Sequence, residues 1–459
     1  MRRPLIIATG LTAGMLLARA FGAPALADPT GAALSPSLHL HFPLLNILLA
    51  PLFDIWDGVS MLGMRQLVAF SIWTAVAIVV WRVGAWAHRR TSAQADGRPG
   101  ARAVSSERLS VRSLLTELAI VLGGVLALLL FGLVGLVWHR PMVSLVGAPA
   151  GQLVVDLHTH TNVSHDVQGT LMRGFDAEAA RRWHRRAGFD VFFITDHNRI
   201  DGIPADGGPA GAVPALCPGE EVSAADQHVV LLGNTSLVNN HDYGDSLPGI
   251  LRLFRDAGPH FGAIAIASIP EYDKNHFHDL HKFADAGVLG FEIVNGAPKA
   301  NELTLAHRDS VIALARARNL VLLGVSDSHG WGATAEGWTL VRVDGRQARD
   351  AQRHGRSDAP EAIRAVIPSV RASERLSTFP PVCTAILNAL ERGYGATQIA
   401  ARHRLRPDGW WPRWLTPVGV VWEGWRAMGV AQALGWLLWI WGIAAVAARR
   451  AVTSSDDRP

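Results

Sequence analysis

The chain reads Leu153-Val154-Val155-Asp156-Leu157-His158-Thr159-His160, a short apolar run that ends in two histidines. A run of this length, rich in branched aliphatic residues and bounded by polar ones, is typical of a buried strand. Residues two apart on an extended segment point to the same side, so His158 and His160 can reach one metal ion together. We take this segment as the first strand of a domain that begins near residue 151.

The same pattern returns along the middle of the chain. Apolar runs predict further strands at residues 191–195, 229–233, 263–267, 290–294 and 320–325. Amphipathic stretches predict helices at residues 176–187, 247–257, 276–286 and 302–318. Alternating strands and helices are typical of an α/β fold with a parallel sheet or barrel, in which functional side chains stand at the carboxyl ends of the strands.

Side chains that bind metal ions gather at these strand ends. They are His165 and Asp166 after the first strand, Asp196 and His197 after the second, Glu220 and Glu221 before His228, and Asp327 and His329 after the last. Imidazole and carboxylate ligands suit Zn²⁺, Mn²⁺ and Fe²⁺. A closed structural zinc site needs only four ligands, and roughly twice that number stand here, which favours a hydrolytic centre with more than one ion.

In the order and spacing of these residues, the middle of the chain resembles the PHP (polymerase and histidinol phosphatase) family. The motifs that carry the resemblance are Asp156-Leu157-His158-Thr159-His160-Thr161, Ser164-His165-Asp166, Thr195-Asp196-His197-Asn198, Pro218-Gly219-Glu220-Glu221-Val222 and Ser326-Asp327-Ser328-His329-Gly330, all within residues 154–343. The resemblance implies a distorted (β/α)7 barrel that holds two or three divalent ions, Mn, Fe or Zn, and hydrolyses phosphate esters. No polymerase-like region accompanies these motifs.

The resemblance also implies roles for individual residues. It implies metal ligands at His158, His160, His197, Glu221, His228, Asp327 and His329, with His165 or Asp166 as a further ligand. Two residues are catalytic candidates. Asp196 is expected to orient a neighbouring group, and Arg199, just after the same motif, is the candidate to grip a phosphate.

The chain departs from the family at one position. Where the family has a histidine before a proline, this chain has Ile269, whose side chain cannot bind a metal ion. Glu271, His276 and His278 follow closely. They either replace the missing ligand, or the two histidines belong to the surface of a helix.

Apolar segments flank the domain. Residues 66–87, 114–138 and 427–448 are long and apolar enough to cross a bilayer as helices. Residues 1–27 have a basic start, an apolar run and small residues at their end, which fits a signal peptide or an uncleaved N-terminal anchor. The shorter stretch 38–53 contains two prolines and fits an interfacial or re-entrant piece.

Charge asymmetry predicts the orientation. The loop between the first two spans is basic, with Arg82, Arg89, Arg90, Arg98, Arg102, Arg108 and Arg112. Basic loops stay in the cytoplasm, so we expect the domain on the periplasmic or extracellular side. The expected layout is a membrane region at 28–150, a metallohydrolase domain at 151–345, barrel periphery and linker at 346–417, and a C-terminal span and tail at 418–459. Within the linker, residues 410–414 are expected to approach the membrane surface.

Composition excludes several classes of protein. Hydrophobic residues make up 49% of the 459 residues and charged residues 18%, which is too apolar for a disordered or fully soluble chain. The net charge of +4 comes with only three lysines, so a nucleic-acid partner is not favoured. Cys217 and Cys383 are too few for a disulfide framework. We expect inert buried thiols, with a bridge in an oxidising compartment as the alternative.

Together these features predict a membrane-anchored, outward-facing, metal-dependent phosphoesterase. The expected substrate is a phosphorylated small molecule or a lipid-linked phosphate. Two alternatives stay open: a non-catalytic domain that senses a ligand, and a metal-dependent hydrolase of a substrate without phosphate.

Overall fold

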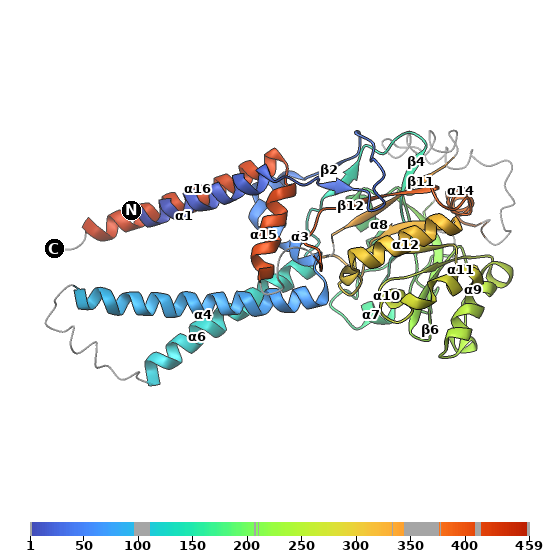
Figure 1. Cartoon of the computed structure of the whole chain (residues 1–459), viewed down its shortest axis with the longest axis horizontal. Coiled ribbons are helices and arrows are strands. Elements are labelled where there is room, and N and C mark those ends of the chain that lie inside the picture. The colour runs from blue at the N-terminus through green and yellow to red at the C-terminus, as the bar shows by residue number, and fades with distance from the viewer. Residues whose placement is uncertain are drawn as a thin grey trace.

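The structure, a computed structural model, has two parts (Figure 1). An α/β domain forms one part, and long helices extend from one of its ends. The described residues are 2–95, 111–205, 208–209, 211–332, 334–343, 376, 378–408 and 415–456. Residues 346–375 and 409–414 of the expected linker, which include the tryptophan-rich segment 410–414, and part of the basic loop therefore lie outside the described residues.

A curled, mixed sheet of ten strands forms the core of the domain. Its order is β1-β12-β11-β4-β5-β6-β7-β8-β9-β10. The strands are β1 (Leu26–Ala27), β4 (Gln152–Asp156), β5 (Val191–Ile194), β6 (Ala215–Ala224), β7 (Gln227–Leu232), β8 (Ile264–Ala267), β9 (Gly290–Asn295), β10 (Val321–Val325), β11 (Gly337–Arg342) and β12 (Thr397–Arg402). The expected α/β barrel-like fold is confirmed, and all six strands predicted from apolar runs are present.

Helices pack around this sheet. They are α8 (Ala177–Ala187), α9 (Leu247–Phe261), α11 (Leu280–Ala286), α12 (Leu305–Arg318) and α14 (Pro381–Leu390), with the short α7 (His165–Gln168) and α10 (Glu271–Lys274) near strand ends. The boundaries of α8 follow from its sequence. Asp176 caps its first turn by accepting a hydrogen bond from the Ala179 amide, and Gly188, at φ +88°, ends it in the left-handed conformation.

The sheet differs from a purely parallel barrel at β7. This strand runs antiparallel to both β6 and β8, whereas β4, β5 and β6 are parallel to one another. The reason is the connection from β6 to β7, a turn through Ala225 and Asp226 that is too short for a helical crossover. Glu220 and Glu221 accordingly lie inside β6, a strand that the apolar pattern did not reveal.

Hydrogen bonds beyond the strand ends bring β4 and the last parallel strand, β10, together. The amide of Asp327 donates to the carbonyl of His158, and the amide of His160 donates to the carbonyl of Ser328, each at 3.0 Å. On the same side, Thr339 Oγ1 of β11 donates to the carbonyl of Gly324 and accepts from its amide. The two histidine-bearing segments are thus fastened to each other.

Cys217 of β6 and Cys383 of α14 form a disulfide across 166 residues of sequence. The expectation of inert thiols is therefore wrong, and the alternative of a bridge holds. Both residues are fully buried in an apolar cluster. Disulfides are typical of domains outside the cytoplasm.

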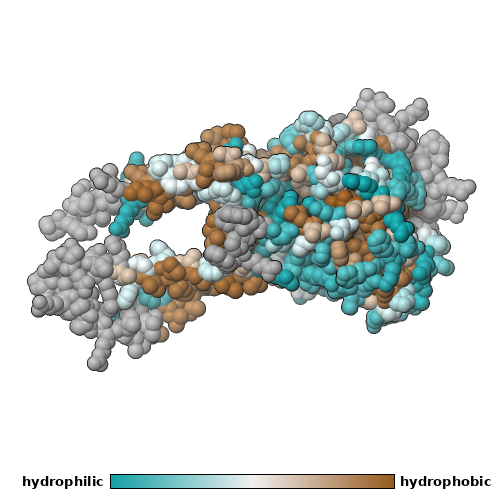
Figure 2. Space-filling model, in the orientation of Figure 1, coloured by the Kyte–Doolittle hydropathy of each residue, from teal (hydrophilic) through white to brown (hydrophobic). Residues whose placement is uncertain are grey.

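Three long apolar helices are present where the sequence predicts membrane spans. Helices α4 (Met64–Ala95), α6 (Val111–Val137) and α16 (Val430–Asp456) contain stretches long and apolar enough to cross a membrane, at Met64–Ala87, Leu115–Val137 and Val430–Arg450. Figure 2 shows hydrophobic residues along these helices and a largely hydrophilic surface on the domain. The helices indicate membrane association.

Shorter elements connect the helices to the domain. The stretch expected as an interfacial or re-entrant piece contains α2 (Leu44–Leu48) and the start of α3 (Ala50–Ser60), both too short to span a bilayer. Helix α15 (Thr416–Ala427) precedes α16, and a two-stranded sheet joins β2 (His39–His41) to β3 (Ser144–Val146).

The N-terminal helix α1 (Arg2–Ala20) packs along the C-terminal helices. Its Met15 and Ala18 are buried in a cluster with Trp425 and Met428. Beyond α1, the amide of His403 donates to the carbonyl of Ala25, and β1 pairs with β12.

Cleavage after residue 27 would remove both α1 and β1, together with the contacts that they make. We expect the purified chain to keep these residues, because their loss would expose the apolar faces of α15 and α16. Intact-mass measurement of the protein from a membrane fraction checks this. A mass that starts at Asp28 would contradict it.

Candidate metal centre

Four side-chain atoms converge where β4, β6 and β10 end or pass. His158 Nε2 and His160 Nε2 lie 3.0 Å apart, and Glu221 Oε2 lies 3.1 and 3.2 Å from them. Asp327 Oδ1 lies 3.0 Å from His160 Nε2 and 3.5 Å from His158 Nε2. All four side chains are buried or nearly so.

These spacings fit a metal ion. Four ligand atoms placed tetrahedrally about 2.1 Å from one ion lie about 3.4 Å from one another. The five separations given above are 3.0 to 3.5 Å, and His158, His160 and Asp327 form one group that could hold an ion. Imidazole nitrogens and carboxylate oxygens are ligands that Zn²⁺, Mn²⁺ and Fe²⁺ accept. The group could therefore hold a divalent ion.

A second group adjoins the first. Asp166 Oδ2 lies 2.6 Å from His329 Nε2 and 3.3 Å from His197 Nε2, and His197 Nε2 lies 3.2 Å from Glu221 Oε2. Of the two ligand candidates that the sequence left open, Asp166 lies in this group, whereas His165 is exposed and only its ring approaches His197, at 4.9 Å between centroids. Together with His160, these residues form further groups suited to a metal ion.

A third group of ligand atoms lies around His228. Its Nδ1 is 3.3 Å from Glu221 Oε1 and 3.7 Å from Glu271 Oε1. The other carboxylate oxygen of Glu271 is buried without a hydrogen-bond partner. A buried carboxylate oxygen left unpaired beside a histidine is a place where a cation would be stabilised.

Ile269 takes no part in the group around His228. Its side chain is 2% exposed and belongs to an apolar cluster. His276 Nδ1 lies 3.5 Å from Asp279 Oδ2, and His278 lies edge-on to a neighbouring phenylalanine. Of the three residues that could replace the missing ligand, Glu271 is the one with a recorded contact to a residue of the centre, His228, among the described residues.

Two supporting residues were missed from the sequence. Glu292 of β9 accepts a hydrogen bond from His158 Nδ1 at 2.7 Å, which turns the other ring nitrogen, Nε2, toward the centre. Asp156 Oδ1 accepts from the amide of Ser326 at 3.0 Å, and its Oδ2 lies 2.8 Å from His184 Nε2. Both carboxylates are fully buried and hold the ligand-bearing segments in place.

The two catalytic candidates lie beside the centre rather than within it. Asp196 accepts hydrogen bonds from the amide and hydroxyl of Thr161, at 2.6 and 2.7 Å, and so fixes the segment that follows His160. Arg199 is exposed and makes a two-pronged pair with Asp201. Its role as a phosphate grip stays a prediction.

Opposite charges inside the centre shift its pKa values strongly. Burial lowers the pKa of His160, but hydrogen bonds with Asp327 and Glu221 raise it to about 10. Burial likewise opposes the charge of His228, yet the Glu221 carboxylate raises its pKa to about 9. Burial would raise the pKa of Glu221, but His158 and the other histidines around it hold that pKa well below the usual range.

Metal affinity should therefore depend on pH. Without an ion, His160 and His228 hold protons at pH 7, and an ion must displace them before it binds. Apparent affinity should rise from pH 6 toward pH 9, by roughly tenfold per pH unit for each displaced proton. Competition with a chelator of known pH dependence measures this. An affinity that stays flat over the range would contradict the charge arrangement.

Comparisons with known proteins add little to this geometry. No protein-family model matches the sequence, and no curated protein matches it. Several solved structures are similar to part of the chain, among them the following two. PsfC from Pseudomonas syringae is 19% identical over 42% of this chain and 84% of its own length, with a TM-score of 0.33. A Bifidobacterium adolescentis protein, provisionally described as a metal-dependent phosphoesterase, is 14% identical over 39% of this chain and 88% of its own, with a TM-score of 0.25. Similarities this distant transfer no residue roles, so the function rests on the site itself.

Proposed function

We propose that the chain is a membrane-anchored, metal-dependent phosphoesterase of the PHP type. The observation that carries the proposal is the position of Glu221. One of its oxygens lies within 3.2 Å of three histidine nitrogens, and the other lies 3.3 Å from a fourth. A carboxylate so placed between groups of ligands suits a bridge between two ions.

Such a pair of ions is well matched to phosphate. Two divalent ions about 3.5–4 Å apart supply Lewis acidity and a nucleophile at neutral pH. His158, His160 and Asp327 would hold one ion with Glu221. His197, Asp166 and His329 would hold the other, and His228 with Glu271 offers a place for a third.

The remaining side chains give this centre an opening on one side. Asp166, His228 and His329 are 29, 32 and 36% exposed, whereas His158 and His160 are at most 1% exposed. A phosphate therefore enters over the first three residues. On the opposite side Glu292 holds the His158 ring and Asp156 pairs with His184, and all four side chains are buried, so charges in the centre act at a low effective dielectric.

A panel of phosphate esters tests the proposal. The full chain in detergent, loaded with Mn²⁺, Fe²⁺ or Zn²⁺, should release phosphate from an aryl phosphate, and a chelator should stop the release. A protein that is fully loaded but hydrolyses no ester in a panel of monoesters and diesters would favour a ligand-sensing role instead.

We also propose that the domain faces the periplasm or cell exterior. The basic loop after the first span and the disulfide between Cys217 and Cys383 support this orientation.

Reporter fusions test the orientation. Alkaline phosphatase folds only outside the cytoplasm, so a fusion after Val343 should be active and a fusion after Ala95 inactive. The reverse pattern would place the domain in the cytoplasm and overturn this part of the proposal.

A further inference from the structure

The segment after β10 joins the metal centre to the end of a membrane helix. His329 belongs to the centre, and Trp331, two residues later, contacts His139 with ring centroids 3.9 Å apart and the two ring planes tilted by 30°. The carbonyl of Gly332 accepts a hydrogen bond from Arg140 Nη1 at 2.8 Å. Arg140 stands three residues beyond Val137, the last residue of the second span. The centre and this span are thus linked by direct contacts.

Gly332 itself lies against the last turn of that helix. A β-carbon at this position would lie 2.0 Å from the carbonyl oxygen of Leu136 and 2.4 Å from that of Gly135. From His329 to Gly332 the chain can extend at most about 11 Å. The Cα atom of His329, a residue of the centre, therefore lies within about 11 Å of the Cα atom of Gly332, which touches the helix of the second span.

A second strand end makes the same kind of contact. After β9, the carbonyl of Pro298 accepts a hydrogen bond from the amide of Met64 at 3.2 Å. Glu302 accepts from the amide of Arg65 at 3.0 Å. Met64 is the first residue of the first span. Two spans therefore meet the barrel at the carboxyl ends of its strands, where the metal centre lies.

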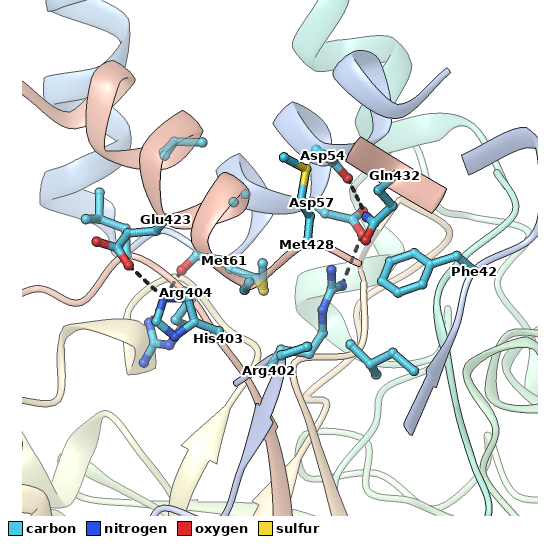
Figure 3. Close-up of a pocket in the computed structure, with 17 residues that line it drawn as sticks. Phe42, Asp54, Asp57, Met61, Arg402, His403, Arg404, Glu423, Met428 and Gln432 are labelled. Atoms are coloured by element: carbon cyan, nitrogen blue, oxygen red, sulfur yellow. Dashed lines mark hydrogen bonds and ion pairs between the residues drawn. The ribbon is translucent and has the colours of Figure 1, made fainter. Parts of the chain in front are cut away.

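Buried ion pairs hold this arrangement. Asp57 of α3 pairs with Arg140 at 2.8 Å and with Arg402, the last residue of β12, at 3.0 Å. Figure 3 shows Arg402 paired with Asp57 in the lining of a small cavity of about 60 Å³, and Asp54 accepting from Gln432 of α16. Removing one partner of a buried pair is costly, so the barrel is held in one orientation on the helices.

We propose that the substrate is a phosphate ester carried on a membrane lipid, hydrolysed while the lipid chains stay in the bilayer. The inference rests on the proposed function. Head groups extend roughly 5–7 Å beyond the hydrocarbon on each side, so a lipid phosphate lies within reach of a centre this close to the helix ends. In the reaction, the oxygen of water forms a new bond to phosphorus, the bond from phosphorus to the lipid oxygen breaks, and that oxygen takes up a proton.

Paired substrates distinguish a lipid source from a soluble one. The full chain is reconstituted in vesicles and given phosphatidate, a polyprenyl diphosphate or phosphatidylglycerol. The soluble counterparts are glycerol 3-phosphate, isopentenyl diphosphate and glycerophosphoglycerol. We expect kcat/KM for at least one lipid to exceed that of its counterpart by at least a hundredfold.

Two exposed leucines give a matched pair of variants. Leu171 is 70% exposed, and its neighbour Met172 packs against Gly330, beside His329. Leu237 is 56% exposed and follows β7, and the amide of the next residue, Val238, donates to Glu220 on the face of β6 that is turned away from the centre. Leu171→Asp should raise KM for the vesicle lipid several-fold and leave aryl phosphate hydrolysis unchanged, whereas Leu237→Asp should change neither.

Three results would overturn the inference. Soluble esters hydrolysed as fast as their lipid counterparts would show that the membrane does not present the substrate. Equal effects of the two leucine variants would show that the opening of the metal centre does not lie on the bilayer. Hydrolysis of aryl phosphate without hydrolysis of any lipid would exclude lipid substrates but leave the phosphoesterase standing, whereas no hydrolysis of any ester would remove both.

Discussion

Glu221→Gln should cost the protein at least one bound metal ion per chain and lower phosphate release at least about a hundredfold. Replacement of a residue that merely supports a ligand typically costs about 10–100-fold in metal affinity or activity, and Glu221 touches four histidines directly. The amide keeps the shape of the carboxylate but loses the charge that compensates the ion. Metal analysis and phosphate release on the same sample measure both losses.

The adjacent residue provides the control. Glu220 is also buried in β6, but it points to the other face of the strand, where its Oε2 accepts from Asn234 Nδ2 at 2.9 Å and from the amide of Val238 at 3.1 Å. Burial raises the pKa of Glu220 to about 7. Glu220→Gln should therefore leave metal content and rate nearly unchanged. Equal losses of metal and activity in the two variants would mean that Glu221 is not a metal ligand.

Glu292→Gln should weaken metal binding by about 10–100-fold, because it removes the charge that orients His158. Glutamine also brings an amide group next to Asn295 Nδ2 and the amide of Ile269, both of which donate to the carboxylate. At saturating metal, part of the rate should return, which separates a positioning role from loss of the fold. Metal titration followed by rate measurement distinguishes the two.

Glu336→Gln is the control for this variant. Glu336 is 2% exposed and accepts from Asn301 Nδ2 at 3.0 Å, away from the histidines. The Glu336→Gln variant should bind metal with the same affinity as the unmodified chain. If metal affinity in Glu292→Gln also stays within twofold, the hydrogen bond to His158 has no role in holding the ion.

Much of the centre could be predicted because its residues follow a local rule. His158 and His160, and likewise Asp327 and His329, are two apart just beyond apolar runs, and extended backbone places such pairs on one side. The apolar runs also located six of the ten strands of the sheet and the three long apolar helices. Burial on both faces makes parallel strands continuously apolar.

The rest depends on contacts between distant segments. Glu292 reaches His158 across 134 residues of sequence, and only a carboxylate inside the apolar run 290–294 could have signalled it. Glu271 lies beside His228 because a short helix turns it inward, which no periodicity reveals. The disulfide closes 166 residues, and two isolated cysteines carry no pattern from which pairing can be read.

The position of the barrel on the membrane helices is also non-local. Arg140 and Asp57 enter the sequence as isolated charges near apolar segments, and only the fold pairs them in a buried site. The sequence predicts the metal-binding side chains at the strand ends and the lengths of the helices. It does not predict that the strand ends lie against the helices.

Metal stoichiometry of the purified full chain, measured with phosphate release on the same sample, tests the central claim most directly. The account predicts at least two divalent ions per chain, loss of both ions and activity on chelation, and recovery of both when Mn²⁺, Fe²⁺ or Zn²⁺ is returned. A chain that binds less than one ion at saturating metal, or that hydrolyses phosphate esters equally well after complete chelation, would contradict it.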